Sequence, residues 1–417
     1  MRYSNIISVC VVFLTMIIFC GISQAQGPAT AELIIEEGPL LTLYGAGTDT
    51  SVFGLATISN GSFVWYDDSN SIEEYMDAIT LYDESINTPT GSVSLIASSV
   101  QMASLLGVPE ADASFGGLNV VRGSNDTIYA MLRDFSEATV PEGQDQLAIF
   151  RIPNTGGNNF SSVELVADGN RLLINSSLTN CTMDVDPSTT PDTLFFILDD
   201  TNNANDTTTN GLYSLPGNAN NDTDPTLIVT LGAITDVLGT ADVGCESIAV
   251  VPGGDIFIND GRSSSMTGSI VRITRSGECS VFLDATDLVA NGSAYGCAMD
   301  YNEVTGLLAL FWEKGATATE GEYDDRIDEY DIVTGEKIGT VITEDELMVL
   351  SSNDFDADIT SGNISNSFTN DGEYYYNFNT NGTEFLARIV APIPQPTSTP
   401  APTATPSSHV DVWTIYR

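Results

Sequence analysis

The sequence predicts an all-β fold made of one four-stranded unit that recurs along the chain. The clearest copy is residues 245–284, where short β-branched runs alternate with segments rich in Gly, Pro and Ser, as expected for strands and turns. Four consecutive antiparallel strands form a meander, and an isolated sheet of this size buries too little apolar surface to be stable. The fold therefore depends on repetition of the unit. The four runs are 247–251, 255–258, 269–274 and 280–283.

The same unit is recognisable five more times. Each copy has an apolar first strand, a Gly, Asn or Pro turn, a second strand that usually ends in an acid, and a third apolar run. Equivalent positions recur at steps of 51 to 69 residues, which is typical of propeller blades with long loops. We therefore expect a six-bladed β-propeller of four-stranded antiparallel blades, with two packed β-sandwiches as the alternative. The equivalent positions are Leu55, Leu118, Met183, Ile248, Met299 and Phe368.

The two ends of the repeat region predict how the ring closes. The sixth unit has only three strands before Pro392, whereas segment 32–44 is an apolar, β-prone strand that precedes the first unit. Pairing this N-terminal strand with the last blade would remove an open sheet edge. We expect a propeller over 26–391, a Pro/Thr-rich linker over 392–408 and a short C-terminal stub at 409–417.

Residues 1–25 have the pattern of a secretory signal peptide. Arg2 precedes an apolar run, and small residues at 23 and 25 offer a cleavage site. An uncleaved membrane anchor is the alternative, because the apolar run nearly reaches membrane-spanning length. We expect a protein that is secreted or held at the cell surface.

The charge of the chain is strongly negative. Its 57 Asp and Glu outnumber its 13 Lys and Arg, which gives a formal net charge of −44. Such a surface repels nucleic acid and anionic membranes and suits saline water, divalent cations or a basic partner. We expect a monomer with no nucleic acid, no membrane contact apart from the signal peptide, and an unknown extracellular ligand, either carbohydrate or protein.

Histidine and lysine are too scarce for several kinds of active site. The single histidine, His409, lies in the C-terminal stub, so the propeller can have no Ser-His-Asp triad and no histidine metal ligand. The scarcity of Lys and Arg also disfavours a phosphate-binding site, because phosphate needs charged donors.

One blade carries four recognisable motifs. They are Glu246-Ser247-Ile248-Ala249, Pro252-Gly253-Gly254, Ile256–Asp260 and Gly268-Ser269-Ile270-Val271-Arg272. These motifs are similar to the blade consensus of the SMP-30/gluconolactonase and NHL (TolB-like) group of six-bladed propellers. This resemblance implies a Ca²⁺ or Zn²⁺ ion in the central channel, held by Glu, Asn and Asp at the starts of inner strands. Glu246 occupies such a slot, and Asp184 and Asp300 could point into the channel from the neighbouring blades.

The acids that end the second strands form a second candidate calcium site. They would ring one face of the propeller with hard oxygen ligands, although Asp commonly ends strands because it caps turns. The aspartate-rich segment 199–206 is a third candidate. The strand-end acids are Asp67, Asp68, Asp134, Asp199, Asp200, Asp260 and Glu313.

Four cysteines remain after removal of the leader. Cys181, Cys245 and Cys297 begin the first strands of three consecutive units, and Cys279 follows a turn on the opposite face. They allow three connectivities of two disulfides in an oxidising compartment. Neighbouring first strands can be too far apart for two unstrained bridges, so we favour a single Cys245–Cys297 disulfide.

These observations predict a secreted, acidic propeller that acts as an extracellular binding or interaction module, which calcium could stabilise. The alternative is a calcium-dependent hydrolase of the lactonase kind, whose metal ligands would be Glu246, Asp260, Asp300 and Asp184. A surface-layer component anchored by its C-terminal tail is a third hypothesis.

Overall fold

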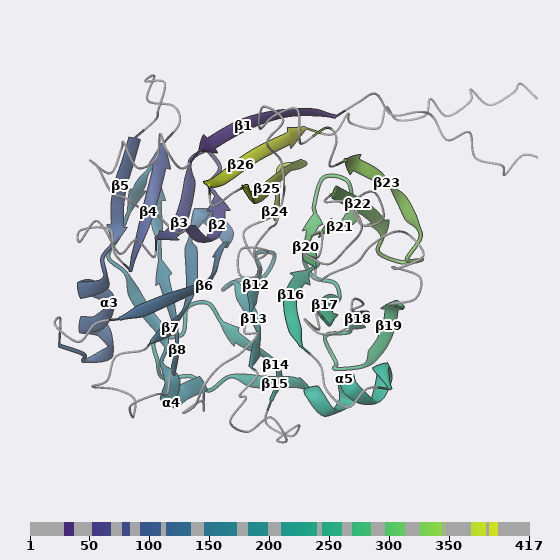
Figure 1. The fold of residues 1–417 in the computed structure, drawn as a ribbon. Coiled ribbons are helices and arrows are strands. Elements are labelled where there is room, and N and C mark those ends of the chain that lie inside the picture. Colours follow the sequence, from purple (N-terminus) through teal and green to yellow (C-terminus); the bar gives the residue numbers. More distant parts are fainter. Residues whose placement is uncertain are drawn as a thin grey trace, which may run out of the picture. The chain divides into compact units, whose positions relative to one another are not determined.

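The computed structural model describes residues 29–36, 52–67, 77–83, 92–109, 114–134, 146–172, 182–198, 210–239, 244–260, 269–284, 297–312, 326–343, 346, 368–380 and 383–390. Their strands form six four-stranded antiparallel sheets, which are the blades of a six-bladed β-propeller (Figure 1). The predicted fold class is therefore confirmed. The predicted signal peptide, the Pro/Thr linker and the C-terminal stub lie outside the described residues.

Blades 1 to 3 come from the first half of the chain. In each blade the first strand in sequence faces the centre of the ring, where it contacts the first strands of its neighbours. Blade 2 also carries a small hairpin, β9 and β10, between its third and fourth strands. The strands are β2 (Val52–Thr57), β3 (Phe63–Asp67), β4 (Ala78–Asp83), β5 (Ser92–Ala97); β6 (Phe115–Arg122), β7 (Ile128–Asp134), β8 (Gln146–Ile152), β9 (Asn154–Gly156), β10 (Asn159–Phe160), β11 (Glu164–Ala167); and β12 (Met183–Asp186), β13 (Thr193–Leu198), β14 (Gly211–Pro216), β15 (Thr226–Thr230).

Blades 4 to 6 complete the ring. Blade 4 is the four-stranded unit that the sequence marks most clearly, and its strands fall where the apolar runs predict them. All six equivalent apolar positions lie in first strands, as expected. The strands are β16 (Cys245–Val250), β17 (Ile256–Asp260), β18 (Ile270–Ile273), β19 (Cys279–Leu283); β20 (Cys297–Asn302), β21 (Leu307–Trp312), β22 (Arg326–Asp331), β23 (Lys337–Ile342); and β24 (Phe368–Asn370), β25 (Glu373–Thr380), β26 (Thr383–Val390) with β1 (Thr30–Glu36).

The N-terminal strand closes the ring as predicted. Strand β1 pairs antiparallel with β26, from Thr30 opposite Val390 to Glu36 opposite Phe385, and so becomes the outermost strand of blade 6. Blade 6 thus joins the two ends of the propeller sequence, which lie together in Figure 1. The described strand is shorter than the predicted segment 32–44, whose last residues lie outside the described part.

Short helices lie on three connections between blades. Helix α3 (Ser99–Leu106) begins with a capping box, in which the Ser98 hydroxyl accepts from the Gln101 N–H and the Gln101 side chain accepts from the Ser98 N–H. Helix α4 (Gly169–Leu172) and helix α5 (Leu231–Leu238) occupy the next two connections. Within the described ranges, no helix has the length and apolar character needed to cross a membrane.

The hydrophobic core is divided into six clusters, one between each pair of neighbouring blades. Strand β3 shows why: Val64 and Tyr66 pack towards blade 2, whereas Phe63 and Trp65 pack towards blade 6. Successive side chains of a strand point to opposite faces, and here both faces are buried against a neighbouring blade. This double burial explains why the apolar residues alternate only weakly in the sequence.

One glycine marks the close approach of two blades at the centre. Gly54 lies at a register shift in β2 with a φ of +59°, a conformation that favours glycine. A Cβ atom there would lie 2.4 Å from the backbone nitrogen of Val120 in β6. The first strands of blades 1 and 2 therefore pack at a distance that only glycine permits.

A buried ionic cluster stabilises blade 5. The carboxylate of Asp328 is fully buried and accepts hydrogen bonds from Trp312 Nε1 at 3.1 Å, Arg326 Nε at 2.9 Å and Thr340 Oγ1 at 2.7 Å. Lys337 Nζ lies 2.7 Å from Asp328 Oδ1, the oxygen that also accepts from Thr340. Asp328 thus balances two of the few cations in the chain.

Candidate functional site in the central channel

A cavity of about 500 Å³ lies among the first strands of the six blades, and we call it the channel pocket. The first hairpin turns of several blades complete its wall. Because the contributing segments are far apart in sequence, the pocket exists only once the ring has closed. The strand residues that line it are 55–57 of β2, 120–122 of β6, 184–185 of β12, Val250 of β16, 300–301 of β20 and 368–370 of β24.

Two carboxylates in this wall connect neighbouring blades. Asp184 of β12 accepts hydrogen bonds from the N–H groups of Val185 and Val250, both at 2.7 Å, and Val250 belongs to the next blade. Asp300 of β20 accepts from the Tyr301 N–H at 2.7 Å and from the Thr369 N–H of the next blade at 2.6 Å. A first strand is the inner edge of its sheet, so its N–H groups need partners outside the ladder. These side chains supply such partners.

The environment of this pair favours the protonated form. Burial, followed by the negative charge of Asp300, raises the pKa of Asp184 to about 8, although its two N–H donors oppose the shift. Burial likewise raises the pKa of Asp300 to about 6, against hydrogen bonds from Thr369 and Tyr301. Because the two groups interact, ionisation of Asp300 makes ionisation of Asp184 less favourable.

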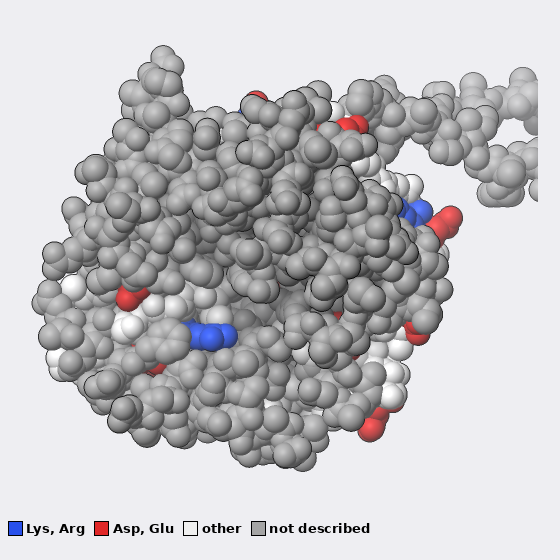
Figure 2. Space-filling view, in the orientation of Figure 1, with Lys and Arg blue, Asp and Glu red and all other residues white. Residues whose placement is uncertain are grey.

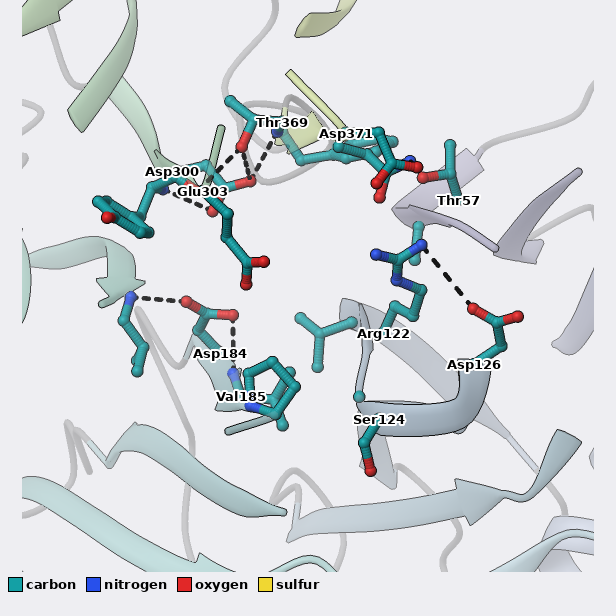
Figure 3. A pocket seen from close by; sticks show the side chains of 18 of the residues that line it. Thr57, Arg122, Ser124, Asp126, Asp184, Val185, Asp300, Glu303, Thr369 and Asp371 are labelled. Atoms are coloured by element: carbon teal, nitrogen blue, oxygen red, sulfur yellow. Dashed lines mark hydrogen bonds and ion pairs between the residues drawn. The ribbon is translucent and has the colours of Figure 1, made fainter. Parts of the chain in front are cut away.

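Charges of opposite sign face each other across the pocket (Figure 3). The carboxylates of Asp184, Asp300 and Glu303 gather on one side, and Arg122 extends from the other side with Asp126 behind it. Arg122 Nη1 lies 3.8 Å from Asp126 Oδ1, which makes a loose ion pair. The carboxylate of Asp371 also lies on the Arg122 side of the pocket. The pocket therefore has an acidic wall and, opposite it, a wall in which Arg122 is accompanied by two carboxylates, and we call this second wall the basic wall after its cation.

The pocket also contains a buried hydroxyl group. Thr57 at the end of β2 is 2% exposed, and its Oγ1 has no hydrogen-bond partner among the residues that the structure describes. A buried hydroxyl without a partner costs about 1–3 kcal/mol of stability. Thr57 lines the pocket, so a molecule held there could supply the missing hydrogen bond.

The structure brings together two of the four predicted metal ligands. Asp184 and Asp300 both line the pocket, as their equivalent strand positions indicated. Asp260 is buried at the other end of the β16–β17 hairpin, opposite Cys245, where it accepts a hydrogen bond from the Gly244 N–H at 2.9 Å. That end is roughly 15–17 Å from the pocket along the strand. Glu246 lies in β16, but its side chain is outside the described part.

The described residues do not make a complete metal site. No group of three or more His, Cys, Asp or Glu side chains within the described ranges could hold a metal ion. Asp184 and Asp300 offer two carboxylates that already accept backbone hydrogen bonds, whereas calcium takes six to eight oxygen ligands. The four-residue site with Glu246 and Asp260 stays a prediction.

The other predicted features are described only in part. Three strand-end acids, Asp67, Asp134 and Asp260, are buried at the ends of second strands. The remaining members of that ring and segment 199–206 lie outside the described residues. Cys245 begins β16 as expected, and Cys279 begins β19. The predicted Cys245–Cys297 disulfide stays a prediction, because the side chain of Cys297 is not described.

Sequence reasoning missed the basic wall and the buried hydroxyl. Thr57 and Arg122 end the first strands of blades 1 and 2, and Glu303 and Asp371 begin the turns of blades 5 and 6. Aligning the six blades in sequence could have identified these residues as candidates, because the C-terminal ends of all six first strands must meet at one end of the channel. That alignment does not say which of these side chains turn inward.

The comparisons with known proteins name no family. No protein-family model and no curated protein matches the chain. Among solved structures, the PQQ-bound aldose sugar dehydrogenase from Streptomyces coelicolor is 12% identical, with a TM-score of 0.49 and coverage of 88% of this chain and 99% of that one. A candidate gluconolactonase is 12% identical, with a TM-score of 0.42 and coverage of 88% and 95%.

A third match has a different activity in its name. An α-L-arabinanase from Penicillium chrysogenum, complexed with arabinobiose, is 9% identical, with a TM-score of 0.47 and coverage of 88% and 99%. Likenesses at this level concern the fold, and the same fold carries many activities. The six sheets of the structure themselves define the class of protein as a six-bladed β-propeller, which is the fold that the resemblance of blade 4 implied.

Proposed function

We propose that this protein is a secreted binding module whose ligand occupies the channel pocket. One observation carries the proposal: a cavity of about 500 Å³ that draws charged and hydroxyl side chains from several blades. This volume lies within the usual range of small-molecule sites, about 300–1,000 Å³. The carboxylates of Asp184 and Asp300 are held by backbone donors from two blades each, so the pocket is rigid before a ligand arrives.

On the face drawn in Figure 2, the described acidic and basic side chains are scattered and do not gather in one place. Secretion rests on the leader-like residues 1–25. Calcium stabilisation rests on the acid-rich composition and on segment 199–206, so we propose it for loops outside the described part.

A thermal-shift screen of the purified protein tests the binding module. The panel contains monosaccharides, amino acids, polyamines and divalent cations. A ligand at 100 times its Kd should stabilise the fold by about 2.7 kcal/mol. The shift should be lost in Thr57→Val, which removes the buried hydroxyl and keeps the side-chain volume. Absence of any shift, or shifts that survive both Thr57→Val and Glu303→Gln, would overturn a site in the channel.

A second candidate function is a calcium-dependent hydrolase of the lactonase kind. It is favoured by the two carboxyl groups that line the pocket, Asp184 and Asp300, because burial raises the pKa of both and carboxyl groups with raised pKa values suit general acid and base roles. Hydrolysis of simple γ- and δ-lactones, followed with Ca²⁺ and with a chelator, tests it. Activity that is equal in Asp300→Asn and wild-type protein would exclude this role for the pair.

A further inference from the structure

The acidic wall of the channel pocket suits a cationic group. Asp184, Asp300 and Glu303 all line the pocket, and the negative charges of Asp300 and Glu303 act on their neighbours strongly enough to shift pKa values. Glu303 is exposed towards solvent, and its carboxylate lies near that of Asp184 in Figure 3. A ligand cation placed here would relieve the repulsion among these groups.

The basic wall has hydrogen-bonding capacity to spare. The contact from Arg122 Nη1 to Asp126, at 3.8 Å, is too long for a hydrogen bond. Both acids on this side already accept hydrogen bonds. The two carboxylate oxygens of Asp126 accept from Ser59, and Asp371 Oδ2 accepts from Asn370 Nδ2 at 3.1 Å. Arg122 is only 29% exposed at its side chain, and it extends into the pocket in Figure 3. A guanidinium pairs well with a carboxylate, often through two parallel hydrogen bonds.

The buried hydroxyl of Thr57 is an independent sign of a ligand. It is 2% exposed, and its Oγ1 has no partner among the residues that the structure describes. It comes from β2, whereas Arg122 comes from β6 and the acidic wall from β12 and β20. A polar molecule spanning the two walls would reach it.

We propose that the channel pocket binds a small zwitterion, in which an ammonium group and a carboxylate are held apart by a short carbon chain. The ammonium group lies at Asp184 and Glu303, and the carboxylate lies at Arg122 with Thr57 as an additional donor. A ligand with one charge would pair with the charged groups of one wall. The charged groups of the other wall would lose part of their hydration without gaining a partner. This inference rests on the proposed function, because it names the ligand class of the same pocket.

Isothermal titration of the full-length protein with a matched set of probes tests the inference. The zwitterions are glycine, β-alanine, γ-aminobutyrate and 5-aminovalerate, which separate the two charges by one to four methylene groups. Butylamine and butyrate carry one charge each on a chain of similar length. At least one zwitterion should bind at least tenfold more tightly than both singly charged probes.

Variants show which wall holds which end of the ligand. Arg122→Gln should reduce zwitterion affinity at least tenfold and leave butylamine binding unchanged. Glu303→Gln should weaken both the zwitterion and butylamine. Arg171→Gln is the matched control, because Arg171 pairs with the exposed Asp224 outside the pocket, and its binding should equal that of the wild type.

Two results would overturn the zwitterion. One is that no probe of the series binds more tightly than butylamine or butyrate. The other is that Arg122→Gln binds the preferred zwitterion as tightly as the wild type. In either case, a compound of the thermal-shift panel that stabilises the wild type but not Thr57→Val would still support the binding module. If no compound of that panel shifts the melting temperature, both proposals are wrong.

Discussion

Replacing Asp184 by Asn should change how the stability of the propeller depends on pH. Unfolded Asp titrates near 3.8, whereas the folded-state pKa values of Asp184 and Asp300 are raised to about 8 and about 6. The folded protein therefore binds more protons than the unfolded chain between pH 4 and 8, and its stability falls as pH rises through this window.

The structure sets the size of the effect. Each unit of pKa shift changes the free energy of unfolding by about 1.4 kcal/mol. Asp184 and Asp300 are partly exposed to the pocket, so solvent reduces the effect of their shifts. We expect the wild type to lose about 2–4 kcal/mol between pH 5 and 8.5. Asn at position 184 cannot ionise, so this source of pH dependence disappears. Its amide group can accept only one of the two hydrogen bonds from Val185 and Val250, because the amide nitrogen is a donor. The variant should be less stable by about 1–3 kcal/mol at pH 5.

Thermal and urea unfolding at pH 5, 6, 7 and 8.5 measure both curves. The wild-type Tm should fall by roughly 3–6 °C across the series, while that of Asp184→Asn should fall much less, so that the gap narrows or reverses. Asp224→Asn makes the same substitution at a carboxylate that is 81% exposed, and its curve should run parallel to that of the wild type. A wild-type curve that is flat or rises with pH, or a variant curve as steep as the wild type, would refute this reasoning.

Two further substitutions test the packing of the ring. Asp328→Ala leaves the charges of Arg326 and Lys337 without their buried partner, so it should lower the free energy of unfolding in urea by about 3–5 kcal/mol. Lys337→Met should lower it less. Equal losses in the two variants would contradict the central role of the Asp328 carboxylate. Gly54→Ala should lower the free energy of unfolding by more than about 2 kcal/mol, because the new Cβ would meet the backbone of β6. Gly61→Ala, where no atom lies near the new Cβ, should lower it by about 1 kcal/mol. Similar Tm values for the two variants would argue against the close approach of β2 and β6.

The recurrence of short apolar runs was sufficient to predict the blades and their closure. Strands buried on both faces must be apolar throughout, and the hairpin turns between them need Gly, Asn or Pro, so both signals are local in sequence. The missing fourth strand of the last unit and the spare N-terminal strand predicted the β1–β26 pairing for a similar reason, since an open edge is unfavourable.

The candidate site was only partly predictable. Asp184 and Asp300 stood out because they occupy the same position in blades 3 and 5. Asp260 was grouped with them on a motif, but antiparallel pairing places the end of β17 beside the start of β16, away from the pocket. Arg122 and Thr57 carry no motif at all.

The sequence by itself determined the number of blades, the strand order and the ring closure, because these follow from periodic burial and from turns between sequence neighbours. Only the tertiary structure decided that Asp184 and Asp300 share a cavity with Arg122 and Thr57. These residues come from four blades, and their meeting depends on the stagger and rotation of each first strand about the channel. Interblade packing sets those quantities, and no local pattern of residues encodes them.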